Sequence, residues 1–291
     1  MADRTRRLGD RKEGRRLRSL SPIIAFTPFI MRDRCDACNQ FEGVVDITET
    51  DRWLREQRRE GYKGLGMLHM FIAAYIRVVS HMPGLNRFVA GQRVYARNDI
   101  LVNMMVKRSV EPDSEETVAK VVFEPTDTVY DVYQKMNAAV EEIRASDDSG
   151  TESTARTLLH VPRLLLKFAV WCLRLLDYFD LLPSALLNVS PFHGSMIITD
   201  LGSLGIGPIY HHIYNFGNLP VFLAFGAKRS ETVLNDAGEV VRRKYVDYKI
   251  VCDERICDGS YYASAFKYLR YYLKNPDELT RPPESVAEDI Y

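Results

Sequence analysis

The sequence lacks a net charge and has few cysteines for its length. Lys and Arg together number 39, as do Asp and Glu, so the formal net charge of the 291 residues is zero. Because nucleic acids and acidic macromolecules select an excess of positive charge, the composition does not indicate such a partner. Five cysteines, an odd number, do not suggest a disulfide framework, and they favour a reducing, cytoplasmic compartment.

Two of the cysteines have the spacing of a redox or zinc motif, in Cys35-Asp-Ala-Cys38. No second pair with this spacing exists to complete a four-ligand zinc site. A redox pair of the thioredoxin type begins a helix in a βαβ unit, whereas this pair lies between strand-like runs. We therefore expect neither a metal nor a redox role here.

The N-terminus is locally basic, and no apolar core follows that would make it a secretory signal. Eight arginines and lysines fall within residues 1–18. We expect residues 1–20 to form a basic arm that is solvated or lies at an interface, with contact to lipid or RNA as the alternative. Residues 21–291 show no composition shift large enough to divide them, and we expect a single domain.

The order of helix and strand signals predicts an α/β fold. Apolar periodicity, or a long apolar run, indicates helices at 49–60, 67–82, 129–143 and 260–273. Runs rich in Val, Ile and Tyr indicate strands at 41–47, 92–97, 100–107, 118–123, 195–199, 221–227 and 245–252. Since the strands cluster rather than alternate with helices, we expect a two-layer sandwich of a mixed sheet and packed helices.

The segment 158–182 is unusually apolar. Its ionic residues, Arg163, Lys167, Arg174 and Asp177, fall within a helical stripe roughly 80° wide. Three cations near the middle argue against a membrane-spanning helix, because each costs about 2.5–3.5 kcal/mol on insertion scales. We expect a helical insertion that packs on its own domain or on a neighbouring subunit, with the stripe facing water. Weak contact with a membrane surface is the alternative.

Two motifs near the C-terminus carry a family resemblance. The first, Met196-Ile-Ile-Thr-Asp-Leu-Gly-Ser-Leu-Gly-Ile206, leads into the apolar strand 221–226, and the second is Asp253-Glu-Arg-Ile-Cys-Asp-Gly259. They resemble the F-T-I-S-N-L-G-x-x-G-[VI] and D-H-R-x-x-D-G motifs of the acyltransferase of 2-oxoacid dehydrogenase complexes, which shares its fold with chloramphenicol acetyltransferase. Weaker similarities at Val45-Asp-Ile-Thr48 and Pro83-Gly-Leu-Asn-Arg87 extend the resemblance over most of the chain.

The resemblance implies a homotrimer with an active site at each subunit interface. In that family a histidine acts as general base on the acceptor's hydroxyl or thiol, which attacks an acyl thioester; such a base is worth about 100- to 10,000-fold in rate. A nearby hydroxyl stabilises the oxyanion. Here Glu254 occupies the histidine position and Thr199 the serine position, while Asp258 and Gly259 are retained. The resemblance implies that Asp258 holds local structure through an arginine, and Arg55 is the expected partner.

Glu254 leaves two interpretations open. A carboxylate in an apolar pocket can have its pKa raised toward neutrality and act as a base. Alternatively, Glu254 pairs with Arg255 or another cation and catalyses nothing. His193 could supply the base, with Glu254 fixing its tautomer. His211 and His212 could also compensate, and a structural hydrogen-bonding role is the alternative for each histidine.

The sequence contains no lipoyl-type domain and no Pro/Ala-rich linker before the acyltransferase-like region. We therefore expect a free-standing acyltransferase with acyl-CoA as donor substrate, no covalently bound cofactor and a small-molecule hydroxyl, amine or thiol as acceptor. The alternative is a catalytically inactive trimeric scaffold or binding protein of the same fold.

Overall fold

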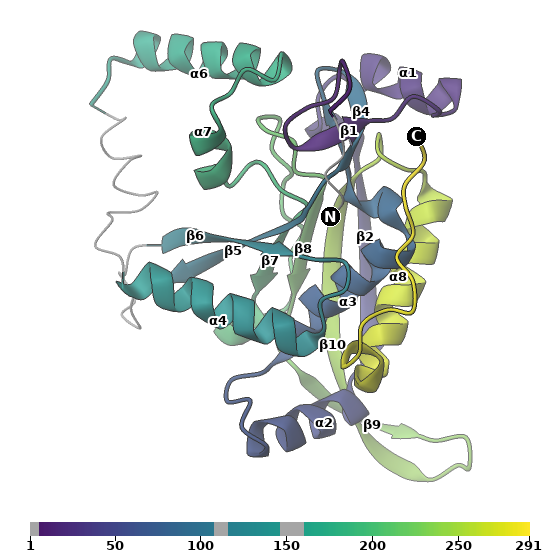
Figure 1. The fold of residues 1–291 in the computed structure, drawn as a ribbon. Coiled ribbons are helices and arrows are strands. Elements are labelled where there is room, and N and C mark those ends of the chain that lie inside the picture. Colours follow the sequence, from purple (N-terminus) through teal and green to yellow (C-terminus); the bar gives the residue numbers. More distant parts are fainter. Residues whose placement is uncertain (1–5, 108–115, 146–159) are drawn as a thin grey trace.

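A mixed β-sheet runs through the centre of the molecule. The computed structural model describes residues 6–107, 116–145 and 160–291 (Figure 1). Within them the strand order of the main sheet is β2-β10-β8-β7-β5-β6. In that order the strands are β2 (Cys38–Asp46), β10 (Val240–Asp253), β8 (Val221–Phe225), β7 (Met196–Asp200), β5 (Ile100–Lys107) and β6 (Glu116–Phe123). A seventh strand, β9 (Arg229–Leu234), forms a hairpin with the first part of β10.

Both parallel and antiparallel pairs occur in this sheet. β7 is parallel to β5 and to β8, whereas β10 is antiparallel to β8 and to β2. Met196 lies opposite Val221, which lies opposite Cys252, and this register aligns the start of β7 with the end of β10. The mixed sheet predicted from the sequence is therefore confirmed.

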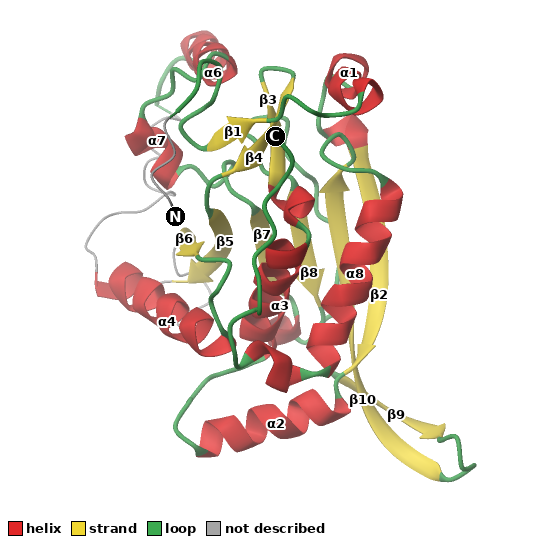
Figure 2. Cartoon of the chain, turned by 45° about the vertical axis from the view of Figure 1, so that its right-hand side comes forward, coloured by secondary structure: helices red, strands yellow, loops and turns green. Residues whose placement is uncertain are grey.

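Three helices cover one face of the sheet (Figures 1 and 2). They are α3 (Met67–His81), α4 (Val129–Ala145) and α8 (Gly259–Lys274), while α2 (Thr48–Arg59) lies at one end of the sheet. Thirteen of the 15 residues of α3 are buried, because this helix contacts the sheet as well as α4 and α8. Its burial explains why α3 appears in the sequence as an apolar run rather than as an amphipathic helix.

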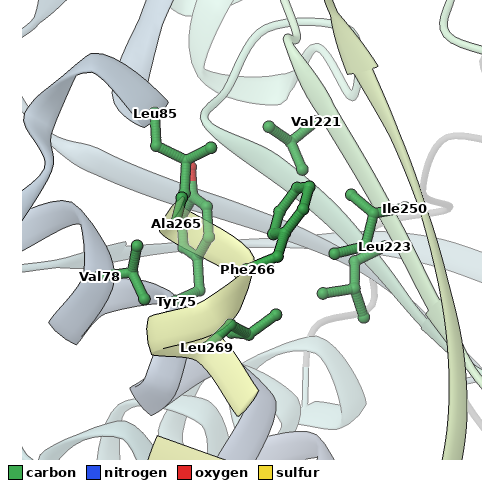
Figure 3. Close-up of a pocket in the computed structure, with 9 residues that line it drawn as sticks. All are labelled: Tyr75, Val78, Leu85, Val221, Leu223, Ile250, Ala265, Phe266 and Leu269. Atoms are coloured by element: carbon green, nitrogen blue, oxygen red, sulfur yellow. The ribbon is translucent and has the colours of Figure 1, made fainter. Parts of the chain in front are cut away.

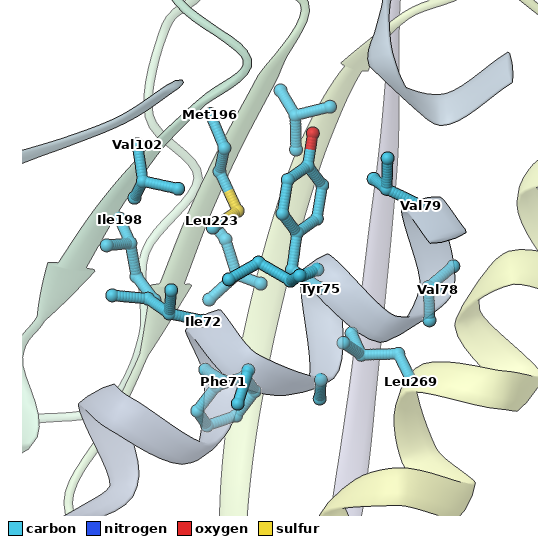
Figure 4. Packing of buried hydrophobic residues seen from close by; sticks show 14 of the residues in the cluster. Phe71, Ile72, Tyr75, Val78, Val79, Val102, Met196, Ile198, Leu223 and Leu269 are labelled. Carbon is cyan, nitrogen blue, oxygen red and sulfur yellow. The ribbon is translucent and has the colours of Figure 1, made fainter. Parts of the chain in front are cut away.

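The core forms where α3 meets the sheet (Figure 4). The ring of Phe71 stacks on that of Phe225 with 4.7 Å between centroids. Ile72 and Tyr75 extend toward Met196 of β7. A cavity of about 10 Å³ remains between α3, α8 and the sheet, and its lining is apolar (Figure 3). A space this small can hold at most one water molecule, so it is a packing defect and not a substrate site.

A second, three-stranded sheet involves the N-terminal segment and corrects one expectation. Its order is β1-β4-β3, with β1 (Gly14–Arg16), β4 (Arg93–Arg97) and β3 (Arg87–Ala90). Arg11 and Leu17 are both buried, at 5% exposed. Over its described residues 6–20, the basic arm expected at 1–20 is therefore part of the fold, because β1 pairs with β4 and Arg11 pairs with buried Asp177.

Three further helices lie near the second sheet: α1 (Pro22–Ile30), α6 (Arg163–Tyr178) and α7 (Ser184–Val189). Short 3₁₀-helices occur at Cys35–Ala37, Pro83–Asn86, Gly202–Leu204 and Pro276–Leu279. None of the described helices is long and apolar enough to cross a membrane.

The predicted helix in 158–182 forms as α6, and residues 158 and 159 lie outside the described part of the chain. Of the two expected positions, packing of the apolar face on its own domain is wrong, while packing on a neighbouring subunit stays a prediction; the three cations of the stripe are exposed, as expected. Leu164 is 79% exposed, and Phe168 and Trp171 are more than half exposed, whereas Asp177 is the buried residue of the helix. The reason is ionic, because Arg11 and His193 both contact the Asp177 carboxylate and hold this end of α6 on the domain.

Candidate functional site

The end of β10 is built around a buried carboxylate shared by two arginines. Asp253 is 0% exposed. Its Oδ1 and Oδ2 accept hydrogen bonds from Arg255 at 2.8 and 2.7 Å, and its Oδ2 also accepts one from Arg34 Nε at 3.2 Å. Arg34 in turn donates to the carbonyls of Tyr214 and Gly217. Three segments remote in sequence are thereby fixed around the motif loop.

Glu254 follows directly and is half-buried. Its backbone N–H donates to the carbonyl of Ala37 at 2.8 Å, which fixes the position of the residue. Arg255, the suggested ionic partner of Glu254, is instead occupied by Asp253. The Glu254 side chain makes no hydrogen bond or ion pair with any residue that the structure describes. The carboxylate at the expected base position is therefore free to accept a proton.

Asp258 holds local structure, as expected, but it does so as a helix cap and not through an arginine. It is the N-cap of α8, where its Oδ1 accepts hydrogen bonds from the Tyr261 N–H at 2.8 Å and the Ser260 hydroxyl at 2.7 Å. These two bonds lower the pKa of Asp258. The pairing with Arg55 is wrong, because Arg55 lies on α2 and pairs with Asp51 one turn earlier. A carboxylate at the N-cap suffices to hold the start of α8.

Thr199 lies near the end of β7, on the sheet face that points away from α3. Its neighbour Ile198 belongs to the α3 core, and successive residues of a strand alternate between faces. The Thr199 hydroxyl has no hydrogen-bond partner among the described residues, so it can donate to a substrate oxygen. Sequence reasoning missed the adjacent Asp200, although it stands in the same motif. Burial raises the pKa of Asp200, and its Oδ1 accepts a hydrogen bond from Ser203.

Thr199 and Glu254 do not meet within one chain. Thr199 lies opposite Ala224, which lies opposite Lys249 of β10. Asp253, the last residue of β10, is four residues beyond Lys249, which is about 13 Å at about 3.3 Å per residue, and Glu254 follows it, so the two side chains are at least about 13 Å apart along the sheet. A site that uses both residues must therefore draw them from two copies of the chain.

His193 does not pair with Glu254. It is 1% exposed, its Nδ1 lies 2.7 Å from Ser190 Oγ, and its Nε2 lies 3.5 Å from the Asp177 carboxylate. The pKa of Asp177 is lowered, in part by His193 and Arg11, against the opposing effect of burial. His193 thus connects α6 to the segment that precedes β7, and the predicted His193–Glu254 pair is wrong.

The remaining candidates lie apart from these residues. His211 stacks on Phe222 with 4.2 Å between ring centroids, and burial lowers its pKa, while His212 is exposed. Cys38 donates its thiol to the Arg34 carbonyl, and burial raises the pKa of that thiol. Across the described ranges, no group of three His, Cys, Asp or Glu residues could hold a metal ion.

A cleft of about 390 Å³ opens beside the Asp253 cluster. Four arginines line it, namely Arg32, Arg34, Arg174 and Arg255. Gly91, in the turn between β3 and β4, forms part of the rim with a φ of +53°, and a Cβ there would lie 2.8 Å from the Tyr178 carbonyl. Glycine therefore allows this turn to approach the end of α6.

Residues 185–281 match the model of the 2-oxoacid dehydrogenases acyltransferase (catalytic domain) family. The matched range contains Thr199, Glu254 and Asp258. Among curated proteins, no sequence matches this chain.

Solved structures resemble nearly the whole chain. A probable dihydrolipoamide acetyltransferase from Listeria monocytogenes 4b F2365 has a TM-score of 0.58 at 13% identity, over 94% of this chain and 99% of that chain. The cubic core of the pyruvate dehydrogenase multienzyme complex has a TM-score of 0.53 at 15% identity, over 88% of each chain. A chloramphenicol acetyltransferase has a TM-score of 0.51 at 10% identity, over 86% of this chain and 94% of that chain. These similarities, with the family match, confirm the predicted resemblance and fold class.

Proposed function

We propose that this chain, which has the fold of dihydrolipoamide acetyltransferase and chloramphenicol acetyltransferase, is an acyltransferase. Its donor is a thioester, acyl-CoA, and its acceptor is the hydroxyl, amine or thiol of a small molecule. The family match and the solved structures support acyl transfer. The observation that carries the proposal is the half-buried Glu254 carboxylate, which has no ionic partner among described residues and stands in the family's base position.

In the proposed reaction, Glu254 accepts the proton of the acceptor group as that group attacks the thioester carbonyl carbon. The carbonyl oxygen becomes an oxyanion, to which the Thr199 hydroxyl donates a hydrogen bond. When the tetrahedral intermediate collapses, the carbon–sulfur bond breaks and the proton on Glu254 passes to the leaving thiolate. A carboxylate is a weaker base than imidazole at neutral pH, so we expect a slow enzyme.

The proposal includes a homotrimer. The separation of Thr199 and Glu254 within one chain supports it, because a complete site then needs a second copy. The sheet face that carries Thr199 also exposes Val44, Met105 and Val122, each at about half of its surface. The similar cubic core is itself an assembly.

The test is thiol release from acetyl-CoA with a panel of hydroxyl, amine and thiol acceptors. We expect Glu254→Gln to lower the rate at least tenfold, since the amide cannot accept the proton. Glu284→Gln is the matched control, because Glu284 is exposed and has no ionic partner in the described chain. Equal rates for wild type and Glu254→Gln would remove Glu254 from the reaction.

The second candidate function is an inactive trimeric scaffold or binding protein. The replacement of the family's histidine by Glu254 favours it. Calorimetry with acetyl-CoA separates the two candidates: a scaffold would show no thiol release and no binding of acetyl-CoA, whereas a slow enzyme would bind it.

Two further proposals concern location. Weak contact of 158–182 with a membrane surface is supported by the exposed apolar side chains of α6. A reducing, cytoplasmic location is supported by the five cysteines, all of which are free thiols in the structure.

A further inference from the structure

The arginine-lined cleft lies between two helices that expose apolar side chains. On α1, Ile23 is 80% exposed and Phe26 is 60% exposed. On α6, Phe168 and Trp171 stack on each other at 5.9 Å, and both are more than half exposed. Figures 1 and 2 both place α1 and α6 at the same end of the molecule. The cleft joins them, because Arg32 follows α1 and Arg174 belongs to α6.

The charges of the cleft are not balanced within the described chain. Arg34 and Arg255 share the single carboxylate of Asp253. The side chains of Arg32 and Arg174 have neither an ion pair nor a hydrogen bond to any described residue. Two acidic residues also line the cleft: Asp177 is paired with Arg11 and His193, and Asp33 is exposed. With the Asp253 carboxylate counted, four arginines face three aspartates, and Asp177 is already paired with Arg11, so the walls remain positively charged.

The exposed surface of α6 is also positively charged. Arg163, Lys167 and Arg174 are exposed, and the acidic residue of the helix, Asp177, is buried. The helix thus presents cations and apolar rings to its surroundings, with no exposed carboxylate. This composition is typical of helices that lie in the interface of an anionic membrane.

We propose that this end of the molecule docks on an anionic membrane surface, with the cleft binding a phosphate head group and α1 and α6 inserting their apolar side chains. The inference rests on the proposed membrane contact of 158–182 and adds a head-group site and a second helix to it. Guanidinium groups bind phosphate through paired hydrogen bonds, which suits Arg32 and Arg174. Contact between this face and the same face of a second copy would bring like charges together around the cleft, whereas anionic head groups would neutralise Arg32 and Arg174, so the charge favours the lipid over such a contact.

The experiment uses Trp171 as a reporter. Trp53 and Trp171 are the tryptophans of the chain, so Trp53→Phe leaves Trp171 alone. The protein is mixed with vesicles of phosphatidylcholine, or of phosphatidylcholine with phosphatidylglycerol, and Trp171 emission and co-sedimentation are measured. We expect a blue shift and sedimentation with the anionic vesicles, both weakened by salt.

The cleft is tested by Arg32→Gln combined with Arg174→Gln. Each basic residue near an anionic surface contributes about fivefold in affinity, so the double variant should bind about 25-fold more weakly. Arg59→Gln combined with Arg242→Gln is the matched control, since both arginines are exposed on α2 and on the β9–β10 hairpin, at the other end of the molecule (Figure 1).

Each unexpected result of the vesicle and variant experiments would overturn a different part of the proposal. No binding of wild type to either vesicle would overturn the docking proposal. Equal affinities of the cleft variant and the control would overturn the head-group site and leave the membrane contact standing. Binding of millimolar inorganic phosphate by a protein that does not sediment with vesicles would identify a site for a free anion instead of a lipid head group. If Phe168→Ser lowers the molecular mass of the protein in solution without vesicles, the exposed apolar side chains of α6 contact a second copy and not a lipid surface. Thiol release in solution tests acyl transfer independently of all these outcomes.

Discussion

Three acidic residues lie close together at the end of β10, and each has different surroundings. Asp253 is buried between Arg34 and Arg255. Glu254 is half-buried without a partner in the described chain, and Asp258 caps α8. Of the three, Glu254 alone therefore combines a position inside the motif with a carboxylate that is available for chemistry.

Replacing Asp253 with alanine should destabilise the fold by about 3–5 kcal/mol, because Arg34 and Arg255 would remain buried without their shared carboxylate. Urea unfolding measures the loss. Asp236→Ala is the control, since Asp236 is exposed in the turn between β9 and β10, and it should change the free energy of unfolding by less than about 0.5 kcal/mol. Similar losses in both variants would contradict a structural role for the Asp253 cluster.

Restoring the family's histidine by Glu254→His should raise the rate of thiol release at pH 7 about tenfold or more. Imidazole has an ordinary pKa of about 6.5, against about 4.3 for a glutamate, and is therefore a stronger base at neutral pH. The rate should rise with pH through about 6.5 as the imidazole loses its proton. A rate below that of wild type across this range would mean that the site has adapted to a carboxylate.

At the scale of the elements, α3 begins with an unusual cap. The Gly66 N–H donates to Nδ1 of His69, which is the N3 residue of the helix. Burial lowers the pKa of His69 to about 4. Only the neutral ring can accept this hydrogen bond, so the start of the helix depends on a deprotonated, buried histidine.

This cap predicts a pH dependence of stability. The folded-state pKa of His69 is about 4, below its ordinary value of 6.5, so the unfolded chain binds a proton first as pH falls. The neutral His69 ring therefore stabilises the folded state by about 3 kcal/mol above pH 6.5, and this stabilisation is lost as the pH falls toward 4. Urea unfolding between these pH values should show a smaller pH dependence in His69→Gln. His212→Gln, at an exposed histidine, should behave like wild type.

The helix α6 shows how one ion-paired residue can hold a helix on a domain while most of its other side chains stay exposed. Arg163, Lys167 and Arg174 of its ionic stripe are exposed, as expected, whereas Asp177 turns toward the domain to meet Arg11 and His193. The apolar residues of the helix then remain outside the core. Either a second copy of the chain or a lipid surface can cover them, and the vesicle experiment separates these two occupants.

At the scale of the whole molecule, the proposed division of the site between two copies can be tested by mixing two variants. Glu254→Gln and Thr199→Ala should each be at least tenfold slower than wild type alone, whereas mixed trimers should recover about a quarter of the wild-type rate, because that fraction of interfaces would combine two intact residues. The proteins are unfolded together, refolded and assayed for thiol release. No recovery, with native mass spectrometry showing mixed trimers, would contradict the shared site. A monomeric mass would contradict the trimer itself.

Much of the architecture could be predicted from the sequence because local patterns encode it. The expected strand 100–107 has the bounds of β5, and the expected helix 67–82 exceeds α3 by one residue. Strand β10 was predicted from its buried second half alone, because its first half is polar and owes its structure to the hairpin with β9. Helix α1 was missed, since its run of apolar residues has no amphipathic period and contains Pro28.

The sequence by itself determined the fold and the position of the motif loop, because the motifs at 196–206 and 253–259 are contiguous in the chain. Only the tertiary structure decided the partners of the motif residues. Asp253 meets Arg34 across more than two hundred residues, and Asp177 meets Arg11 across more than one hundred and sixty. No local spacing encodes such pairs, because only the folding of the whole sheet brings the two residues together. Once they are buried, each charge needs its partner, since an unpaired buried charge is strongly destabilising.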